Sequence, residues 1–143
     1  MSPRWSIYVT VAAMIFLQGA FSTRSIAVSP EPERPLLSIR LTVGESAINQ
    51  FVEHLKKFGD ARAFAIRSIH TRRDDKHVLV ELWRGDMNMS ATNPFDDPTD
   101  FSLAVYQTGA TEISPTQIDA LIEDLRGAIG KLDGVTIDNI KRR

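Results

Sequence analysis

The chain has 143 residues, with 17 lysines and arginines, 18 aspartates and glutamates, and no cysteine. This length suits one globular domain, and the near-zero net charge excludes the strongly basic footprint of a general nucleic-acid binder. The lack of cysteine excludes a disulfide framework, a thiolate metal site, a cysteine nucleophile and a lipidated cysteine.

The first 27 residues have the pattern of a secretory signal peptide. Arg4 precedes an apolar run over 5–17, and the segment 25–27 offers the small residues that a signal peptidase requires. We therefore expect cleavage after Ala27 and export, most simply to a periplasm. The alternative is an uncleaved membrane anchor. A spanning helix needs about 20 apolar residues, however, and Thr10 and Gln18 interrupt the apolar stretch, which continues to Phe21.

The segment that follows, 28–35, contains Pro30, Pro32 and Pro35. Prolines at such short spacing favour an extended, semi-rigid spacer that has no core of its own. We therefore expect the signal peptide or anchor over 1–27, the proline-rich spacer over 28–35, and a single folded domain over 36–143.

The folded part opens with a strand and a helix. Apolar residues alternate with polar ones over 36–43, which predicts a strand with one wet face. Apolar residues spaced three and four apart over 47–58 predict an amphipathic helix. Gly59 is placed where a helix commonly ends, so we expect it to terminate this helix.

Alternating patterns predict the strands that follow. One is expected over 63–71 and another over 78–83, the second with a continuation as far as Met89. The stretch 91–100 is dense in proline, aspartate and asparagine and predicts a loop, after which 101–105 alternates again as a strand.

The second helix has the clearest start signal. Residues 114–117, Ser-Pro-Thr-Gln, combine an N-cap serine, a proline at the first helical position and a glutamine placed to complete a capping box. Apolar spacing extends this helix to Leu132. A last strand is expected over 135–140, with 141–143 as a frayed basic tail.

These elements predict an α+β fold, a two-layer sandwich in which a mainly antiparallel sheet of four to five strands has two helices on one face. One-sided alternation in most strands indicates that only one face of the sheet is covered. Right-handed crossovers then place both helices on that face. The arrangement resembles the ferredoxin-like βαββαβ plan. This resemblance concerns topology alone and implies no activity.

Catalytic chemistry has weak candidates in this sequence. His70, Asp75 and His77 flank a polar turn and would converge if the two neighbouring strands formed a hairpin, which would suit acid–base chemistry or a metal. No zinc-protease spacing, phosphate-binding loop, dinucleotide fingerprint or serine-nucleophile elbow is present. We therefore expect no metal and no cofactor, and we interpret these residues as solvated.

The more informative residue is Trp83. Strand alternation places it opposite the apolar residues that we expect to pack on the helices, and exposed aromatic residues on an open sheet face commonly mark interaction surfaces. With Arg67 and Arg84 nearby, it forms the expected binding site. The alternative is that the loop over 91–100 folds across Trp83 with its Phe95.

These features favour an exported, non-enzymatic binding or accessory domain of the cell envelope. Its expected partner is a protein or an envelope component, with no nucleic acid, and with a membrane only through an uncleaved N-terminal segment. Two alternatives remain open: a small exported hydrolase or metal-dependent enzyme that uses the histidines, and an inhibitor or immunity-type partner of a secreted enzyme.

Overall fold

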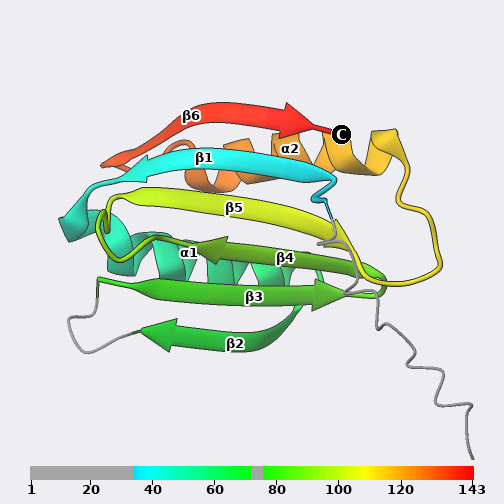
Figure 1. Ribbon diagram of the computed structural model, residues 1–143, viewed down its shortest axis with the longest axis horizontal. Coiled ribbons are helices and arrows are strands. Elements are labelled where there is room, and N and C mark those ends of the chain that lie inside the picture. Colours follow the sequence, from blue (N-terminus) through cyan, green and yellow to red (C-terminus); the bar gives the residue numbers. More distant parts are fainter. Residues whose placement is uncertain (1–33, 72–75) are drawn as a thin grey trace, which may run out of the picture. The chain divides into compact units, whose positions relative to one another are not determined.

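The computed structural model describes residues 34–71 and 76–143, and Figure 1 shows how their helices and strands are arranged. The elements in chain order are β1 (Leu37–Val43), one turn of 3-10 helix (Glu45–Ala47), α1 (Ile48–Ala61), β2 (Ala65–Thr71), β3 (Val78–Arg84), β4 (Met87–Thr92), β5 (Asp100–Gln107), α2 (Pro115–Ile129) and β6 (Val135–Arg142).

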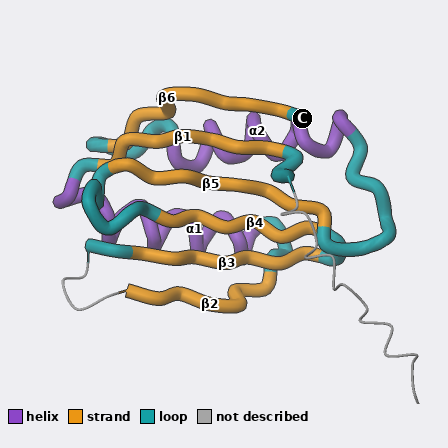
Figure 2. The backbone as a smooth tube through the Cα atoms, in the orientation of Figure 1, coloured by secondary structure: helices purple, strands orange, loops and turns teal. Residues whose placement is uncertain are grey.

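The strands form one sheet in the order β2-β3-β4-β5-β1-β6, and every neighbouring pair is antiparallel. Both helices lie on the same side of this sheet, as the tube in Figure 2 also shows. The prediction of an α+β fold with two helices on one face of an antiparallel sheet is confirmed. The predicted number of four to five strands is too low, because the sheet has six.

The sixth strand arises from a reversal of the chain at Gly85 and Asp86. Arg84 pairs with Met87 across this two-residue turn, and Gly85 has a φ of +54°. A positive φ is what a tight hairpin turn requires and what glycine adopts without steric cost. Residues 85–89 therefore do not continue the preceding strand, as the sequence pattern had suggested, but form the turn and the start of β4 in a hairpin of β3 with β4.

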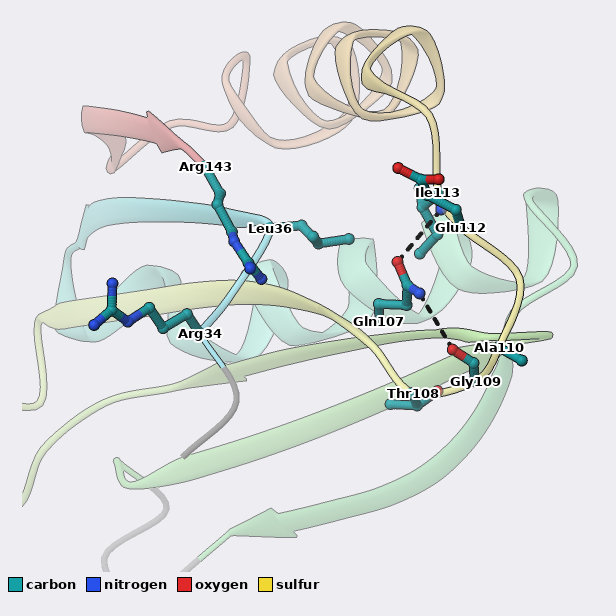
Figure 3. Close-up of a pocket in the computed structure, with 9 residues that line it drawn as sticks. All are labelled: Arg34, Leu36, Gln107, Thr108, Gly109, Ala110, Glu112, Ile113 and Arg143. Atoms are coloured by element: carbon teal, nitrogen blue, oxygen red, sulfur yellow. Dashed lines mark hydrogen bonds between the residues drawn. The ribbon is translucent and has the colours of Figure 1, made fainter. Parts of the chain in front are cut away.

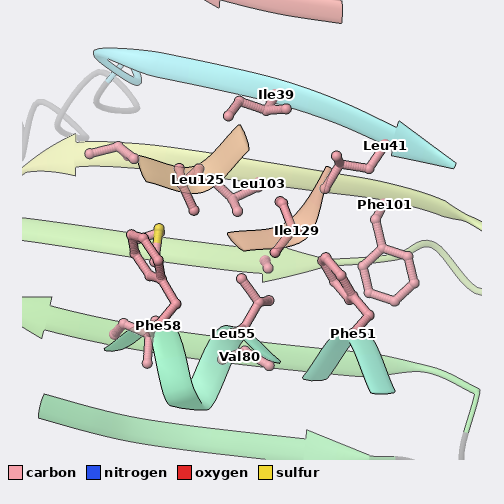
Figure 4. Close-up of a cluster of buried hydrophobic side chains, with 14 of the residues drawn as sticks. Ile39, Leu41, Phe51, Leu55, Phe58, Val80, Phe101, Leu103, Leu125 and Ile129 are labelled. Atoms are coloured by element: carbon pink, nitrogen blue, oxygen red, sulfur yellow. The ribbon is translucent and has the colours of Figure 1, made fainter. Parts of the chain in front are cut away.

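The core lies between the sheet and the helices. Phe51 of α1 packs edge-on against Phe101 of β5, with ring centroids 5.0 Å apart, and neither side chain is exposed. Leu125 and Ile129 of α2 reach the same layer (Figure 4). Because apolar burial is the dominant favourable term in folding, this single cluster, with no disulfide, holds the two layers together.

Gly59 does not terminate the first helix, which continues to Ala61. It is buried inside α1, and a Cβ added to it would lie only 3.2 Å from a methyl group of Leu82 on β3. The glycine thus allows helix and sheet to approach closely, and its role in ending the helix was wrongly predicted.

The second helix begins as predicted. Ser114 Oγ accepts a hydrogen bond from the Gln117 backbone N–H at 3.3 Å, and Gln117 Oε1 accepts one from the Ser114 N–H at 2.8 Å. Pro115 occupies the first helical position. This reciprocal capping satisfies two backbone donors that the helix itself leaves without acceptors.

The basic end of the chain is not frayed. Strand β6 runs to Arg142, which pairs with Leu37, and the Arg143 N–H donates to the Leu36 carbonyl at 3.1 Å. The predicted tail over 141–143 therefore belongs largely to the sheet, because the neighbouring β1 offers backbone partners along its whole length. None of the helices in the described part of the chain is long and apolar enough to cross a membrane.

Candidate functional site

The face of the sheet turned away from the helices, here called the open face, carries aligned rows of side chains. Directly opposed residues of antiparallel strands point to the same side, so the strand register defines each row. One row runs across four strands as Ala65, Trp83, Asn88 and Tyr106. The adjacent row, from Glu81 through Ser90, Ala104 and Ser38 to Lys141, crosses five strands.

Trp83 is the largest side chain in the first row and is stacked with an arginine. The guanidinium carbon of Arg67 lies 4.6 Å from the centre of the Trp83 ring. Arg67 sits where the register between β2 and β3 shifts, so the irregularity brings its side chain onto the open face beside the indole. A cation over an indole ring is worth about 0.5–1 kcal/mol at an exposed site.

The indole N–H of Trp83 is hidden from solvent and has no hydrogen-bond acceptor in the part of the chain that the structure describes. Such a donor loses its hydrogen bonds to water without replacement, at a cost of about 1–3 kcal/mol. Asn88, beside it in the row, is 7% exposed. This end of the open face therefore carries aromatic and polar side chains, and one hydrogen-bond donor, the indole N–H of Trp83, is unsatisfied.

The loop over 93–98 does not bring Phe95 onto Trp83. Phe95 is 60% exposed and lies 4.7 Å from the ring of His77, between ring centres. Asn93, buried, holds the loop in this position, since its side chain donates to the Lys76 and Pro98 carbonyls, both at 2.6 Å. The alternative in which Phe95 covers Trp83 is therefore wrong.

Arg84 is separated from the other two expected binding residues. Its guanidinium group donates to the Arg62 carbonyl at 3.1 Å and lies 4.4 Å from the centre of the Phe64 ring. Neighbouring residues of a strand point to opposite faces, so Arg84 faces away from Trp83. The structure thus brings Arg67 and Trp83 together and places Arg84 at the helix side of the sheet.

The other end of the open face is polar and held by ion pairs. Arg40 binds Asp100 through two hydrogen bonds of 2.9 and 2.8 Å, and this pairing raises the pKa of Arg40. Thr42 donates to the Asp138 carboxylate at 2.8 Å. A shallow pocket of about 340 Å³ lies here, next to Lys141. This end of the open face therefore offers polar and charged groups to a partner, and no large apolar side chain among the residues that the structure describes.

The residues proposed for catalysis are only partly described. Asp75 and the side chain of His70 lie outside the described residues, although the register places the His70 backbone opposite Leu79. The His77 Nε2 atom lies 2.9 Å from the Phe95 carbonyl oxygen, so one ring nitrogen contacts the loop. Among the side chains that the structure describes, which do not include that of His70, no three acidic or histidine groups are placed to hold a metal ion.

Sequence reasoning missed two members of the row, Asn88 and Tyr106. Asn88 belongs to the strand that was not separated from β3, and Tyr106 lies one residue beyond the predicted end of its strand. The signal for Asn88 was the Gly85-Asp86 pair, since a glycine followed by aspartate between two alternating runs is typical of a two-residue hairpin turn.

Comparison with known proteins does not assign this chain to a family. No protein-family model and no curated protein matches this sequence. The class that the structure itself defines is an α+β domain with one helix-covered and one open sheet face.

Proposed function

We propose that this protein is an exported binding or accessory domain of the cell envelope, without enzymatic activity, that recognises a protein or an envelope component through its open face. The observation that carries the proposal is the row containing Trp83, with Arg67 stacked on it, on the side of the sheet opposite both helices.

The composition of this row supports a binding role. Tryptophan, tyrosine and arginine dominate the residues that contribute most to protein–protein binding, and Trp83, Tyr106 and Arg67 share this end of the face. The hidden indole N–H adds to the argument, because a partner that displaces Arg67 and offers an acceptor relieves an unsatisfied donor.

The proposed location follows from the sequence of 1–27, which has a charged start, an apolar run and a small-residue cleavage site. We place the folded domain in the periplasm, released by cleavage after Ala27, or held at the membrane if the segment is retained. Either arrangement leaves the domain in the compartment where an envelope partner is available.

We also infer that the fold is a ferredoxin-like variant. Without β3 and β4, the chain order becomes β-α-β-β-α-β and the sheet order becomes β2-β5-β1-β6. The hairpin of β3 with β4 would then be an insertion that widens the sheet. This insertion carries Trp83 and Asn88, two of the four residues of the proposed binding row.

The test compares retention of a partner by matched variants of the full chain. Trp83→Ala and Arg67→Ala remove the two stacked groups, while Phe95→Ala removes an exposed aromatic residue that does not touch them. Each variant is immobilised and exposed to an envelope extract of the native host. We expect the wild type and Phe95→Ala to retain the same partner, and Trp83→Ala to retain it at least about tenfold less.

Two results would contradict the proposal. The first is equal retention by Trp83→Ala and the wild type. The second is a turnover activity that His70→Ala or His77→Ala abolishes and Trp83→Ala leaves intact, since it would favour the hydrolase or metal-dependent alternative.

A further inference from the structure

A groove lies where β5 ends and the chain passes to α2, apart from the row that contains Trp83. It measures about 780 Å³ and is open to solvent, within the range of roughly 300–1,000 Å³ typical of small-molecule sites. We call it the β5–α2 groove, and Figure 3 shows its residues. Those that bear on its chemistry are Arg34, Leu36, Gln107, Ala110, Ile113 and Arg143.

The loop that forms one wall of the groove is fixed by side chains. Gln107 donates to the Gly109 carbonyl at 3.2 Å and accepts from the Ile113 N–H at 3.4 Å. Asp86, from the turn between β3 and β4, accepts a hydrogen bond from the Thr111 N–H at 2.9 Å. A wall held in this way is formed before a ligand arrives, which lowers the entropic cost of binding.

Gly109 adds to this fixation. A Cβ at this position would lie 2.0 Å from a carboxylate oxygen of Asp86, so a larger residue would displace the carboxylate that holds the loop. The hydroxyl and backbone N–H of Thr111 also lower the pKa of Asp86, so the carboxylate that holds the loop stays ionised at neutral pH.

Two arginine side chains at the groove, those of Arg34 and Arg143, have no ion-pair partner among the residues that the structure describes. Arg142 turns to the helix side, where it forms an ion pair with Asp119 of α2. The next residue, Arg143, lines the groove, and neither it nor Arg34 forms an ion pair with any residue that the structure describes. Among the side chains that line the groove, two are cationic and one, that of Glu112, is anionic.

Apolar side chains lie beside Arg143. Leu36 and Ile113 are half-buried against the main core. Both also line a neighbouring pocket of about 480 Å³, together with Pro115 and Ile118 at the start of α2. Arg143, which lines both pockets, thus stands beside a surface that can accommodate an aliphatic chain, while the Arg34 side chain points away from it in Figure 3.

We infer that the β5–α2 groove binds a small anionic amphiphile, a molecule with a carboxylate or phosphate head and an aliphatic tail. The head group pairs with the guanidinium group of Arg143 and with that of Arg34, which turns toward it from the outward position drawn in Figure 3, and the tail lies on Leu36, Ile113 and Ile118. Charge-assisted hydrogen bonds to guanidinium groups favour these two head groups over neutral ones. This site is independent of the proposed binding through Trp83.

The test titrates the full chain with four probes below their critical micelle concentrations: octanoate, octyl phosphate, octyl glucoside and inorganic phosphate. Amide NMR signals of Ala110 and Ile113 report on the groove itself, so binding to the apolar N-terminal segment does not interfere. Octanoate and octyl phosphate separate the two acidic heads, octyl glucoside provides a neutral head, and inorganic phosphate lacks the tail.

We expect at least one acidic amphiphile to shift both signals to saturation, and octyl glucoside and inorganic phosphate to bind about tenfold more weakly or less. Arg143→Gln and Arg34→Gln should each weaken binding about tenfold. Arg126→Gln is the control, because Arg126 is engaged with Glu123 on the exposed surface of α2, and it should bind like the wild type.

Three results would overturn the inference. They are equal binding of octyl glucoside and the acidic amphiphiles, unchanged affinity in both Arg143→Gln and Arg34→Gln, and no shift of Ala110 or Ile113 with any probe. Trp83→Ala should leave the titration unchanged. The titration thus tests the groove proposal separately from the proposal that a partner binds the open face.

Discussion

Replacing Leu82 with alanine should destabilise the protein far more than the same replacement at its neighbour Trp83. Leu82 is 1% exposed and points into the core, where its methyl groups lie against the position of Gly59 in α1. Trp83 points to the open face and is only half-buried. The two variants therefore test which side of β3 packs against the helices.

The magnitude follows from the surroundings of each side chain. A buried leucine replaced by alanine costs about 2–5 kcal/mol, and the tight packing of α1 on β3 keeps the resulting cavity open, so we expect about 3 kcal/mol. Trp83→Ala loses partial burial and the contact with Arg67 but also removes the unsatisfied indole N–H. We expect a cost of about 1 kcal/mol, since these contributions oppose one another.

The assay is urea denaturation followed by circular dichroism, which does not depend on the tryptophan being replaced. The free energy of unfolding is compared at equal denaturant slopes, because a change in slope would indicate a change in the unfolded state. A cost below about 1 kcal/mol for Leu82→Ala, or a larger cost for Trp83→Ala than for Leu82→Ala, would refute the assignment of faces.

Three further changes follow from local geometry. Ser114→Ala should lower the free energy of unfolding by about 1 kcal/mol, because the N-cap acceptor of α2 is lost, and an unchanged melting temperature would count against the capping box. Gly85→Ala should cost about 1 kcal/mol, since alanine at a φ of +54° is strained; denaturation equal to wild type would show that the turn is not needed. The lowered pKa of Asp86 means that its contribution to stability is present above the ordinary aspartate range, near pH 4, and is lost as the pH falls through its folded-state value. Asp86→Asn should therefore make unfolding less sensitive to pH in that acid range, and identical pH profiles in urea denaturation would contradict this.

Local patterns in the sequence were sufficient for much of the fold. Alternation identified β1 and β5 because one face of each strand meets helices and the other is more exposed. The start of α2 was identified because capping depends on residues adjacent in the chain. Gly59 was misread, since a glycine near a helix end can either terminate the helix or permit a close contact, and only the position of Leu82 distinguishes the two.

The candidate site was less accessible from sequence. The outward orientation of Trp83 follows from alternation, but its stacking with Arg67 depends on a register irregularity between β2 and β3 that no local pattern specifies. The β5–α2 groove brings together Arg34, Gln107 and Arg143, which are distant in the chain. Their proximity is set by pairing of β1 with β5 and β6, which is a property of the whole sheet.

The most direct test of the central claim places a photo-crosslinking amino acid at single positions of the full chain in its native host. Ser90 lies in the row from Glu81 to Lys141, and Ser102, which pairs with Thr92, points to the same open face. Ala120 lies on the exposed surface of α2. We predict that a partner is cross-linked from Ser90 and Ser102 and not from Ala120. Cross-links to that partner from Ala120, with none from the two serine positions, would contradict binding through the open face.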